Sequence, residues 1–419
     1  MKKSIASLLI GAAITSGSAL AEPVLSNVIV SLKPDMNAHL NTVLSDYQLV
    51  PSHTYHTVFS GFAASLPNHT LELLKSDPRV ASISPDTPVK TTLNSTLGCG
   101  LLFNCEEDAQ VTPWGVSRIG ANVTENTGAG VHVYVIDTGI DSNHPDLAAN
   151  LGNGYSVEMC IGLDCRESWD DDQGHGTHVA GTIGARNNNI DVVGVAPEVT
   201  LHAVKVLNAA GSGSNSGVIA GIDWVATQAQ MMEEAVIANM SLGGSGSKTG
   251  TCTESGFNGN DNLHRAVCNA KNAGVIFAVA AGNDGADAEG ATPAAYDDAV
   301  ITVSATNAND DWASWSNWGN NSIPSISTPS APVAIAAPGA DILSLKHGGG
   351  TTSMSGTSMA SPHVAGALAL FLKDTPQSRD ASAFTNALQW VQASSESNAN
   401  FSNTTGKPHS EQHLSADMD

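Results

Sequence analysis

The sequence predicts an α/β protein with three layers and a mostly parallel sheet, preceded by a small α+β domain of the ferredoxin-like kind. Two runs, residues 131–136 and 275–281, are mostly apolar, and the first is rich in β-branched residues, as in strands buried on both faces. Each run ends in a polar turn that contains glycine, and an apolar helical stretch follows Ser358 directly. The first hundred residues differ, because short strands and helices alternate there.

The chain begins with the pattern of a secretory signal peptide. A basic start at residues 1–3 is followed by an apolar stretch at 5–14 and by small residues at 19–21, which form a cleavage site. The apolar stretch is too short to span a membrane, and no later stretch is long and apolar enough. The sequence therefore predicts a secreted, extracellular protein without a membrane anchor, from which residues 1–21 are removed.

Residues 22–92 have the pattern of a separate small domain. Its predicted elements follow the order β-α-β-β-α-β, which by itself would suit any small binding domain. A polar linker at residues 93–108 joins it to the larger part of the chain, residues 109–395. The predicted strands are 28–32, 55–66, which alternates around residues 61–62, and 80–84, and the predicted helices are 40–47 and 71–75.

Three motifs in the larger part indicate nucleophilic catalysis. Ser358 stands directly before an apolar helix, where backbone N–H groups favour the negative charge that develops in acyl transfer. Asp137 follows the strand at 131–136, at the carboxyl end where functional groups of α/β sheets gather. His175 lies in a glycine-rich turn before a helix, and histidine is the side chain that titrates near neutral pH.

Each motif singly also has another explanation. Ser358 could be a helix N-cap, and Asp137 could be a turn aspartate before glycine. His175 and His178 could form a metal pair, although their spacing lacks the HExxH form and no third histidine ligand is near.

The three motifs together resemble the Asp, His and Ser signatures of the subtilases, the subtilisin-like serine proteases, in the same chain order. The resemblance covers roughly residues 109–395 and implies the subtilisin-like fold and a serine endopeptidase. It implies that Ser358 is the nucleophile, that His175 is its general base, and that Asp137 orients His175. It also implies that Asn283, in the turn after the second buried strand, donates its amide to the oxyanion.

The same resemblance identifies residues 22–92 as an inhibitor prodomain, which would aid folding, inhibit the enzyme and be cut off. The protein would then be a self-processed zymogen with protein or peptide substrates and broad specificity, favouring large apolar or aromatic side chains at P1. Asp284, at the mouth of the S1 pocket, would accept basic side chains. The residues implied to bind the substrate as an added strand are Ser241, Leu242, Gly243, Gly211, Gly213, Ala281 and Gly282.

A structural Ca²⁺ site is also implied by the resemblance, position by position. Oxygen ligands from carboxylate, amide and backbone groups suit this ion. Asp191 departs from the small residue that the family often has there, and could add charge or be solvated. Residues 170–172 and 297–298 could bind further calcium ions or form a solvated acidic face. The implied ligands are Gln110, Asp146, Arg186, Asn188, Ile190 and Val192.

Composition bears on the partners and on the redox compartment. The formal net charge of −23 and the lack of a basic stripe argue against nucleic acid as a partner. We expect a soluble monomer. Six cysteines in an exported chain indicate three disulfides, and their clustering favours local pairs. The predicted pairs are Cys99–Cys105, Cys160–Cys165 and Cys252–Cys268.

The C-terminal end departs from the family pattern. The closing strand with its Gly-x-x-Asn pattern is missing, so either the domain ends early or the last strand is absent. Residues 396–419 are rich in Ser, Asn and Asp and are predicted to form a disordered polar tail. His409, Glu411 and His413 resemble a metal motif in the wrong order, which we interpret as fortuitous.

Two other classes of protein share parts of this pattern. A catalytically silent binder with this fold would have a broken triad or oxyanion residue. A calcium-binding adhesion protein would have repeats and a tail anchor. The sequence has an intact set of motifs and neither repeats nor an anchor, so it favours the enzyme.

Overall fold

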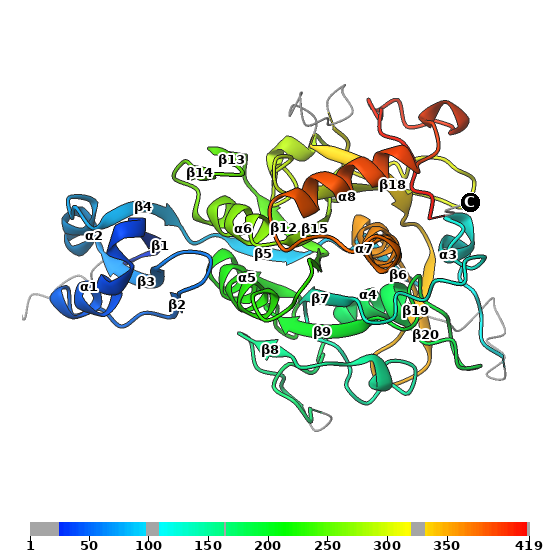
Figure 1. Ribbon diagram of the computed structural model, residues 1–419, viewed down its shortest axis with the longest axis horizontal. Helices are drawn as coiled ribbons and strands as arrows, with labels where there is room; N and C mark the ends of the chain where they lie inside the picture. Colours follow the sequence, from blue (N-terminus) through cyan, green and yellow to red (C-terminus); the bar gives the residue numbers. More distant parts are fainter. Residues whose placement is uncertain (1–24, 98–108, 163–164, 320–331, 417–419) are drawn as a thin grey trace, which may run out of the picture.

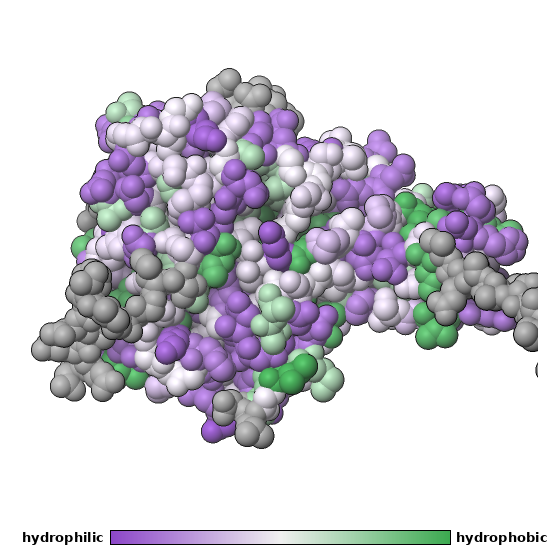
Figure 2. Space-filling model, turned by 180° about the vertical axis from the view of Figure 1, so that it is seen from behind, coloured by the Kyte–Doolittle hydropathy of each residue, from purple (hydrophilic) through white to green (hydrophobic). Residues whose placement is uncertain are grey.

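The computed structural model describes residues 25–97, 109–162, 165–319 and 332–416 (Figure 1). The predicted signal peptide and the predicted Cys99–Cys105 pair lie outside these ranges. Hydrophilic and intermediate residues predominate on the face in Figure 2, where hydrophobic residues form only small separate groups. Among the described residues, none of the helices combines the length and the apolarity needed to cross a membrane.

The N-terminal domain is a four-stranded sheet in the order β2-β3-β1-β4, covered by two helices. Its strand pairs are antiparallel, and Val30, Phe62 and Leu74 are fully buried in its core. The predicted order of strands and helices is confirmed. The elements are β1 (Leu25–Leu32), η1 (Pro34–His39), α1 (Leu40–Asp46), β2 (His53–Tyr55), β3 (Gly61–Pro67), α2 (Asn68–Lys75) and β4 (Val80–Pro85).

A seven-stranded parallel sheet forms the middle layer of the larger domain, in the order β18-β17-β15-β11-β7-β9-β8. Alternate residues of β7 face two cores: Val133 and Val135 pack with α4, α7 and α8, whereas Tyr134 and Ile136 pack with α5 and α6. The predicted three-layer fold is confirmed. The strands are β7 (His132–Asp137), β8 (Tyr155–Ser156), β9 (Thr200–Lys205), β11 (Val236–Met240), β15 (Val275–Ala280), β17 (Ile301–Thr306) and β18 (Val333–Pro338). The helices are α3 (Trp114–Arg118), α4 (His175–Gly184), α5 (Asn215–Ala229), α6 (Asn262–Asn272), α7 (Thr357–Asp374) and α8 (Ser382–Ala393).

Smaller sheets lie outside the main sheet. One has the order β10-β5-β12-β16, and another has the order β19-β20-β6. The first contains β5, from the end of the small domain, and the second contains β6, from the linker. The bounds are β5 (Pro88–Thr91), β6 (Ser95–Leu97), β10 (Ser212–Ser214), β12 (Leu242–Ser245), β13 (Thr251–Thr253), β14 (Gly256–Asn258), β16 (Ala291–Thr292), β19 (Ile342–Leu345) and β20 (Thr351–Ser355).

Two of the three predicted disulfides are present. Cys160 pairs with Cys165 in the loop after β8, and Cys252 pairs with Cys268 between β13 and α6. Both join residues close in sequence, as their spacing predicted.

The end of the chain differs from the prediction of a disordered tail. His413 forms backbone bridges with Ala336 in β18 and with Glu396, and Leu414 is fully buried. The carboxylate of Glu411 accepts hydrogen bonds from Ser304 Oγ at 2.5 Å and Trp312 Nε1 at 2.9 Å. The tail therefore adds to the edge of the main sheet as far as residue 416, and the prediction is wrong there. Its polar composition concealed this, because buried polar groups are stable when they are hydrogen-bonded.

Candidate active site

Asp137 and His175 meet at the end of β7. His175 Nδ1 lies 2.8 Å from Asp137 Oδ1, and their side chains are 1% and 0% exposed. The helix that begins at His175 approaches β7 closely because residue 176 is glycine. A Cβ there would lie 2.1 Å from the carbonyl oxygen of Gly139. The local sequence therefore permits the contact that orients the imidazole.

Ser358 lies in the first turn of α7, and its hydroxyl contacts the chain's own Thr92. Ser358 Oγ is 2.5 Å from the carbonyl oxygen of Thr92 and 3.1 Å from that of Ser241. His175 Nε2 is buried and has no hydrogen-bond partner. The Ser358 hydroxyl therefore donates its hydrogen bond to the Thr92 carbonyl, which occupies the site, and not to His175. In serine enzymes, the hydrogen bond between the serine and the histidine often shortens only in the complex that reacts.

Two N–H groups converge on the carbonyl oxygen of Thr92. Asn283 Nδ2 is 2.5 Å away and the backbone N–H of Ser358 is 3.3 Å away. Asn283 is held in this orientation because its Oδ1 accepts hydrogen bonds at 2.9 Å from both the backbone N–H and the hydroxyl of Thr357. This is the geometry of an oxyanion hole around one peptide carbonyl. The orienting role of Thr357 was not predicted from the sequence, although this residue directly precedes the serine.

β5 runs between β10 and β12 as an added antiparallel strand. Lys90 is opposite Ser212 and Gly243, and Val89 is opposite Gly213. The backbone N–H of Thr91 donates to Gly211, and that of Thr92 donates to Ser241. Two further pairs join Leu242 with Thr91 and Ser214 with Pro88. Five of the predicted substrate-binding residues thus hold this segment: Gly211, Gly213, Ser241, Leu242 and Gly243.

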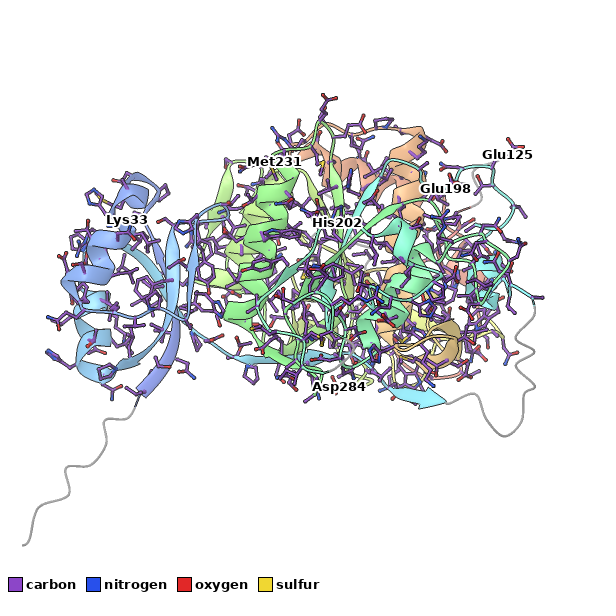
Figure 3. The ribbon with its side chains drawn as sticks, turned by 90° about the horizontal axis from the view of Figure 1, so that it is seen from below. Lys33, Glu125, Glu198, His202, Met231 and Asp284 are labelled. Atoms are coloured by element: carbon purple, nitrogen blue, oxygen red, sulfur yellow. A yellow bond between two sulfur atoms is a disulfide. The ribbon has the colours of Figure 1, made fainter. Side chains whose placement is uncertain are left out.

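The other two predicted substrate-binding residues, Ala281 and Gly282, are buried beside Asn283. A Cβ at Gly282 would lie 2.4 Å from Asn317 Nδ2, and Gly282 has a φ of 106°. The backbone conformation of residue 282 and its packing against Asn317 therefore require glycine, independently of any role in an S1 pocket. Asp284 is exposed and lies at the lower boundary of the larger domain in Figure 3.

Beyond Thr92 the chain continues along β20. The backbone N–H of Asn94 donates to the carbonyl of Ser355 at 2.8 Å, and β6 pairs with β20 in antiparallel register. One continuous segment therefore crosses the site, paired with the larger domain on both sides of the Thr92–Leu93 bond.

The N-terminal domain lies next to α5 and α6 (Figures 1 and 3), and polar contacts join it to these helices. One carboxylate oxygen of Asp223 accepts hydrogen bonds from three consecutive backbone N–H groups, at residues 56–58. Asn262 donates to the carbonyl of Ile29 and accepts from Ser82 Oγ, each at 2.8 Å. These contacts hold the domain where β5 can enter the site.

The predicted calcium ligands lie together. The carbonyl oxygens of Arg186, Ile190 and Val192 lie 2.6, 3.0 and 3.0 Å from Gln110 Nε2, and Asn188 Oδ1 lies 3.4 Å away. Rotating the Gln110 amide would add its oxygen to this ring. Asp146 is buried next to this ring of oxygens. Its Oδ2 accepts a hydrogen bond from the Val192 N–H at 3.4 Å.

Asp146 supplies the charge that a cation needs. Its Oδ1 is buried without a hydrogen-bond partner, and burial raises the pKa of the carboxyl to about 7. An oxygen-rich ring beside an unpartnered carboxylate suits Ca²⁺, so the residues fit this ion. Asp191 is near enough for its charge to raise the pKa of Asp146 further.

The other suggested acidic positions do not form solvated faces. Asp170 and Asp171 are 3% and 1% exposed, and each accepts hydrogen bonds from neighbouring backbone N–H groups. Asp297 and Asp298 pair with the ammonium of Lys248. Local protein donors therefore satisfy these carboxylates.

The alternative of a metal pair at His175 and His178 is also wrong. His178 Nε2 lies 3.0 Å from the carbonyl of Ile342 and 3.2 Å from that of Thr352. Burial lowers the pKa of His178 to about 3, so it is a neutral donor that joins α4 to β19 and β20. Within the described ranges, no cluster of three or more His, Cys, Asp or Glu side chains could hold a metal ion.

Comparison with known proteins gives two family matches. The model of the subtilase family matches residues 128–412, and that of the peptidase inhibitor I9 family matches residues 28–92. The chain is 40% identical over 332 residues to an extracellular serine proteinase of Thermus sp. (strain Rt41A), covering 77% of this chain and 68% of the relative. It is 34% identical over 365 residues to proteinase R of Parengyodontium album, covering 84% and 81%.

A solved structure is also similar. It is the crystal structure of a cold adapted subtilisin-like serine proteinase, which is 34% identical to this chain and superposes with a TM-score of 0.58. The match covers 74% of this chain and 100% of the other.

Proposed function

The chain belongs to the subtilase family of serine endopeptidases, and on that premise we propose that it cuts its own Thr92–Leu93 bond and then hydrolyses other polypeptides. One observation carries the proposal. The carbonyl oxygen of Thr92 receives both Asn283 Nδ2 and the Ser358 N–H, with Ser358 Oγ beside it. A segment that only connected the two domains would not need to place a carbonyl between these donors.

The roles of the residues follow from this geometry. Ser358 Oγ attacks the Thr92 carbonyl carbon while His175 Nε2 takes the hydroxyl proton. Asp137 holds the Nδ1–H side of the ring and stabilises the imidazolium. Asn283 and the Ser358 N–H stabilise the oxyanion. His175 then gives the proton to the leaving amine of Leu93, and water releases the acyl group by the same steps in reverse.

Residues 22–92 would act as an intramolecular inhibitor after the cut. The contacts of Asp223 and Asn262 do not involve the cleaved bond, and β5 would remain in the groove as a bound product. Release of this domain would open the groove between β10 and β12 to other chains. The proposed boundaries are thus an inhibitor domain to residue 92, a linker at 93–108 and a catalytic domain from 109.

Substrates would bind as extended strands, as β5 does. Backbone pairing to β10 and β12 carries little side-chain information, which supports broad specificity. Val89, four residues before the bond, is 3% exposed against the larger domain, which supports an apolar preference at P4. At P1 we propose that large apolar residues are favoured, although this chain presents Thr92 there.

Hydrolysis of casein, with and without a serine-directed inhibitor, tests the activity. Inhibitor-sensitive hydrolysis supports the proposal. Its absence in a folded protein freed of residues 22–92 by another protease would instead favour a silent binder or a calcium-binding adhesion protein. The signal peptide and the extracellular relative from Thermus support secretion, which secreted enzyme in a culture supernatant would establish.

The first product of refolding is expected to begin at Leu93. Intact mass and N-terminal sequence at early times would identify this bond, because later trimming would act on an already exposed terminus. A first cut elsewhere between residues 93 and 109 would contradict the position of Thr92 in the oxyanion hole.

We also propose that the ring around Gln110 binds a structural Ca²⁺. Chelation is expected to lower the thermal midpoint, because an ion that binds only the folded state stabilises that state. Asp146→Ala should remove most of this sensitivity, and Gln110→Ala should remove less, because Asp146 carries the full charge. Thermal midpoints with and without chelator measure both effects. Unchanged chelator sensitivity in Asp146→Ala would contradict the assignment.

A further inference from the structure

A buried lysine lies beneath the end of β7. Lys205 is 0% exposed, and its ammonium donates to the carbonyls of Thr138 at 2.6 Å and Leu207 at 2.9 Å. Its third contact is the carboxylate of Asp172, at 2.7 Å. All three N–H groups of the ammonium thus have acceptors, as a buried charge requires.

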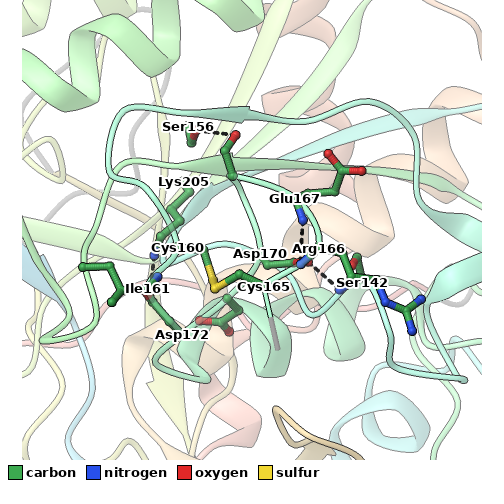
Figure 4. The surroundings of a disulfide bond; sticks show 12 residues. Ser142, Ser156, Cys160, Ile161, Cys165, Arg166, Glu167, Asp170, Asp172 and Lys205 are labelled. Carbon is green, nitrogen blue, oxygen red and sulfur yellow. Dashed lines mark hydrogen bonds and ion pairs between the residues drawn. A yellow bond between two sulfur atoms is a disulfide. The ribbon is translucent and has the colours of Figure 1, made fainter. Parts of the chain in front are cut away.

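Asp172 continues this set of contacts to the nearby disulfide (Figure 4). Its Oδ2 accepts a hydrogen bond at 2.8 Å from the backbone N–H of Ile161, which lies inside the loop closed by Cys160 and Cys165. The backbone N–H of Cys160 in turn donates to the carbonyl of Ser168. The bridge therefore restrains the donor that fixes one oxygen of Asp172, while Lys205 fixes the other.

Lys205 holds the backbone of Thr138, the residue next to Asp137. Thr138 follows Asp137 directly, and Thr138 Oγ1 accepts the backbone N–H of Gly176 at 2.9 Å, next to His175. A shift of the Thr138 backbone would therefore move both members of the Asp–His pair. Asp137 also pairs with Lys205 in the β7–β9 ladder.

We propose that Lys205, Asp172 and the Cys160–Cys165 bridge form a positioning device for Asp137 and His175. The inference rests on the proposed function of these two residues. The bridge restrains Ile161, and the Ile161 N–H holds Asp172. Asp172 in turn holds the Lys205 ammonium, which fixes the Thr138 carbonyl. Asp172 also neutralises a positive charge that would otherwise disfavour the imidazolium formed in the reaction.

The test compares Lys205→Met, Asp172→Asn and the double variant, measuring kcat and KM on a peptide and the thermal midpoint of each. We expect Lys205→Met to lower kcat about tenfold or more with little change in KM, because small displacements of reacting groups are costly. Its midpoint should fall, since Asp172 is left unpaired. The double variant should regain much of the midpoint but not the kcat.

The bridge is tested by Cys160→Ser with Cys165→Ser, and the matched control is Cys252→Ser with Cys268→Ser. The first pair should lower kcat about fivefold, and the control should leave it unchanged, because the second bridge lies between β13 and α6. If a variant no longer matures, the rate of cleavage at Thr92–Leu93 in the full chain replaces kcat.

Two results would overturn the inference. One is a kcat within about twofold of the unaltered enzyme in folded Lys205→Met and double variants. The other is a kcat that recovers together with the midpoint in the double variant, since that describes a purely structural pair. A bridge variant that behaves like its control would remove the disulfide from the device. The proposed function would fail separately, through residual activity in Ser358→Ala.

Discussion

Replacing Ser358 by alanine is expected to leave the chain uncut at Thr92–Leu93 and without proteolytic activity. The hydroxyl is the group beside the Thr92 carbonyl that can attack it, and alanine cannot form the acyl intermediate. Removing Oγ leaves Asn283 and the Ser358 backbone N–H on the same carbonyl. The variant should therefore fold with β5 in place and appear as one full-length species by mass spectrometry.

Ser361→Ala is the matched control. Ser361 lies in the same helix, is equally buried, and donates its hydroxyl hydrogen bond to Asn239 at 2.7 Å. Its loss should affect stability and leave self-cleavage intact. Normal processing of Ser358→Ala would disprove the roles of both Ser358 and residues 22–92.

Asn283→Ala is expected to lower kcat about 10²–10³-fold with little change in KM. The magnitude is the one known for the oxyanion donor of subtilisin itself, and corresponds to about 2.7–4 kcal/mol. The reason is that the amide gains its full interaction only when negative charge develops on the carbonyl oxygen. Steady-state kinetics on a peptide substrate, with the enzyme concentration fixed by active-site titration, would measure the effect.

Thr357→Ala supplies the comparison for this second prediction. It removes the hydroxyl that orients Asn283 but keeps the amide donor and the backbone N–H of residue 357. Its loss of kcat should be smaller than that of Asn283→Ala. A rise in KM alone for Asn283→Ala would instead make this residue a substrate contact.

Local patterns in the sequence predicted the elements that carry the site. The apolar run before Asp137 and the helices after His175 and Ser358 were recognisable because periodicity and turn residues act over a few neighbours. The disulfides Cys160–Cys165 and Cys252–Cys268 were predictable for the same reason, since each closes a short loop. The family resemblance added the proposed calcium ligands, which lie in short segments whose oxygens converge only in the fold.

Contacts between residues far apart in the sequence decided the rest. The position of the Thr92 carbonyl depends on Asn283 and Ser358, and the burial of the Lys205 ammonium depends on Asp172 and Thr138. The polar tail is ordered because Ser304 and Trp312 satisfy Glu411. None of these pairs produces a periodic pattern in the sequence. A buried charge or amide is stable only if its partner is present, and only the tertiary structure supplies that partner.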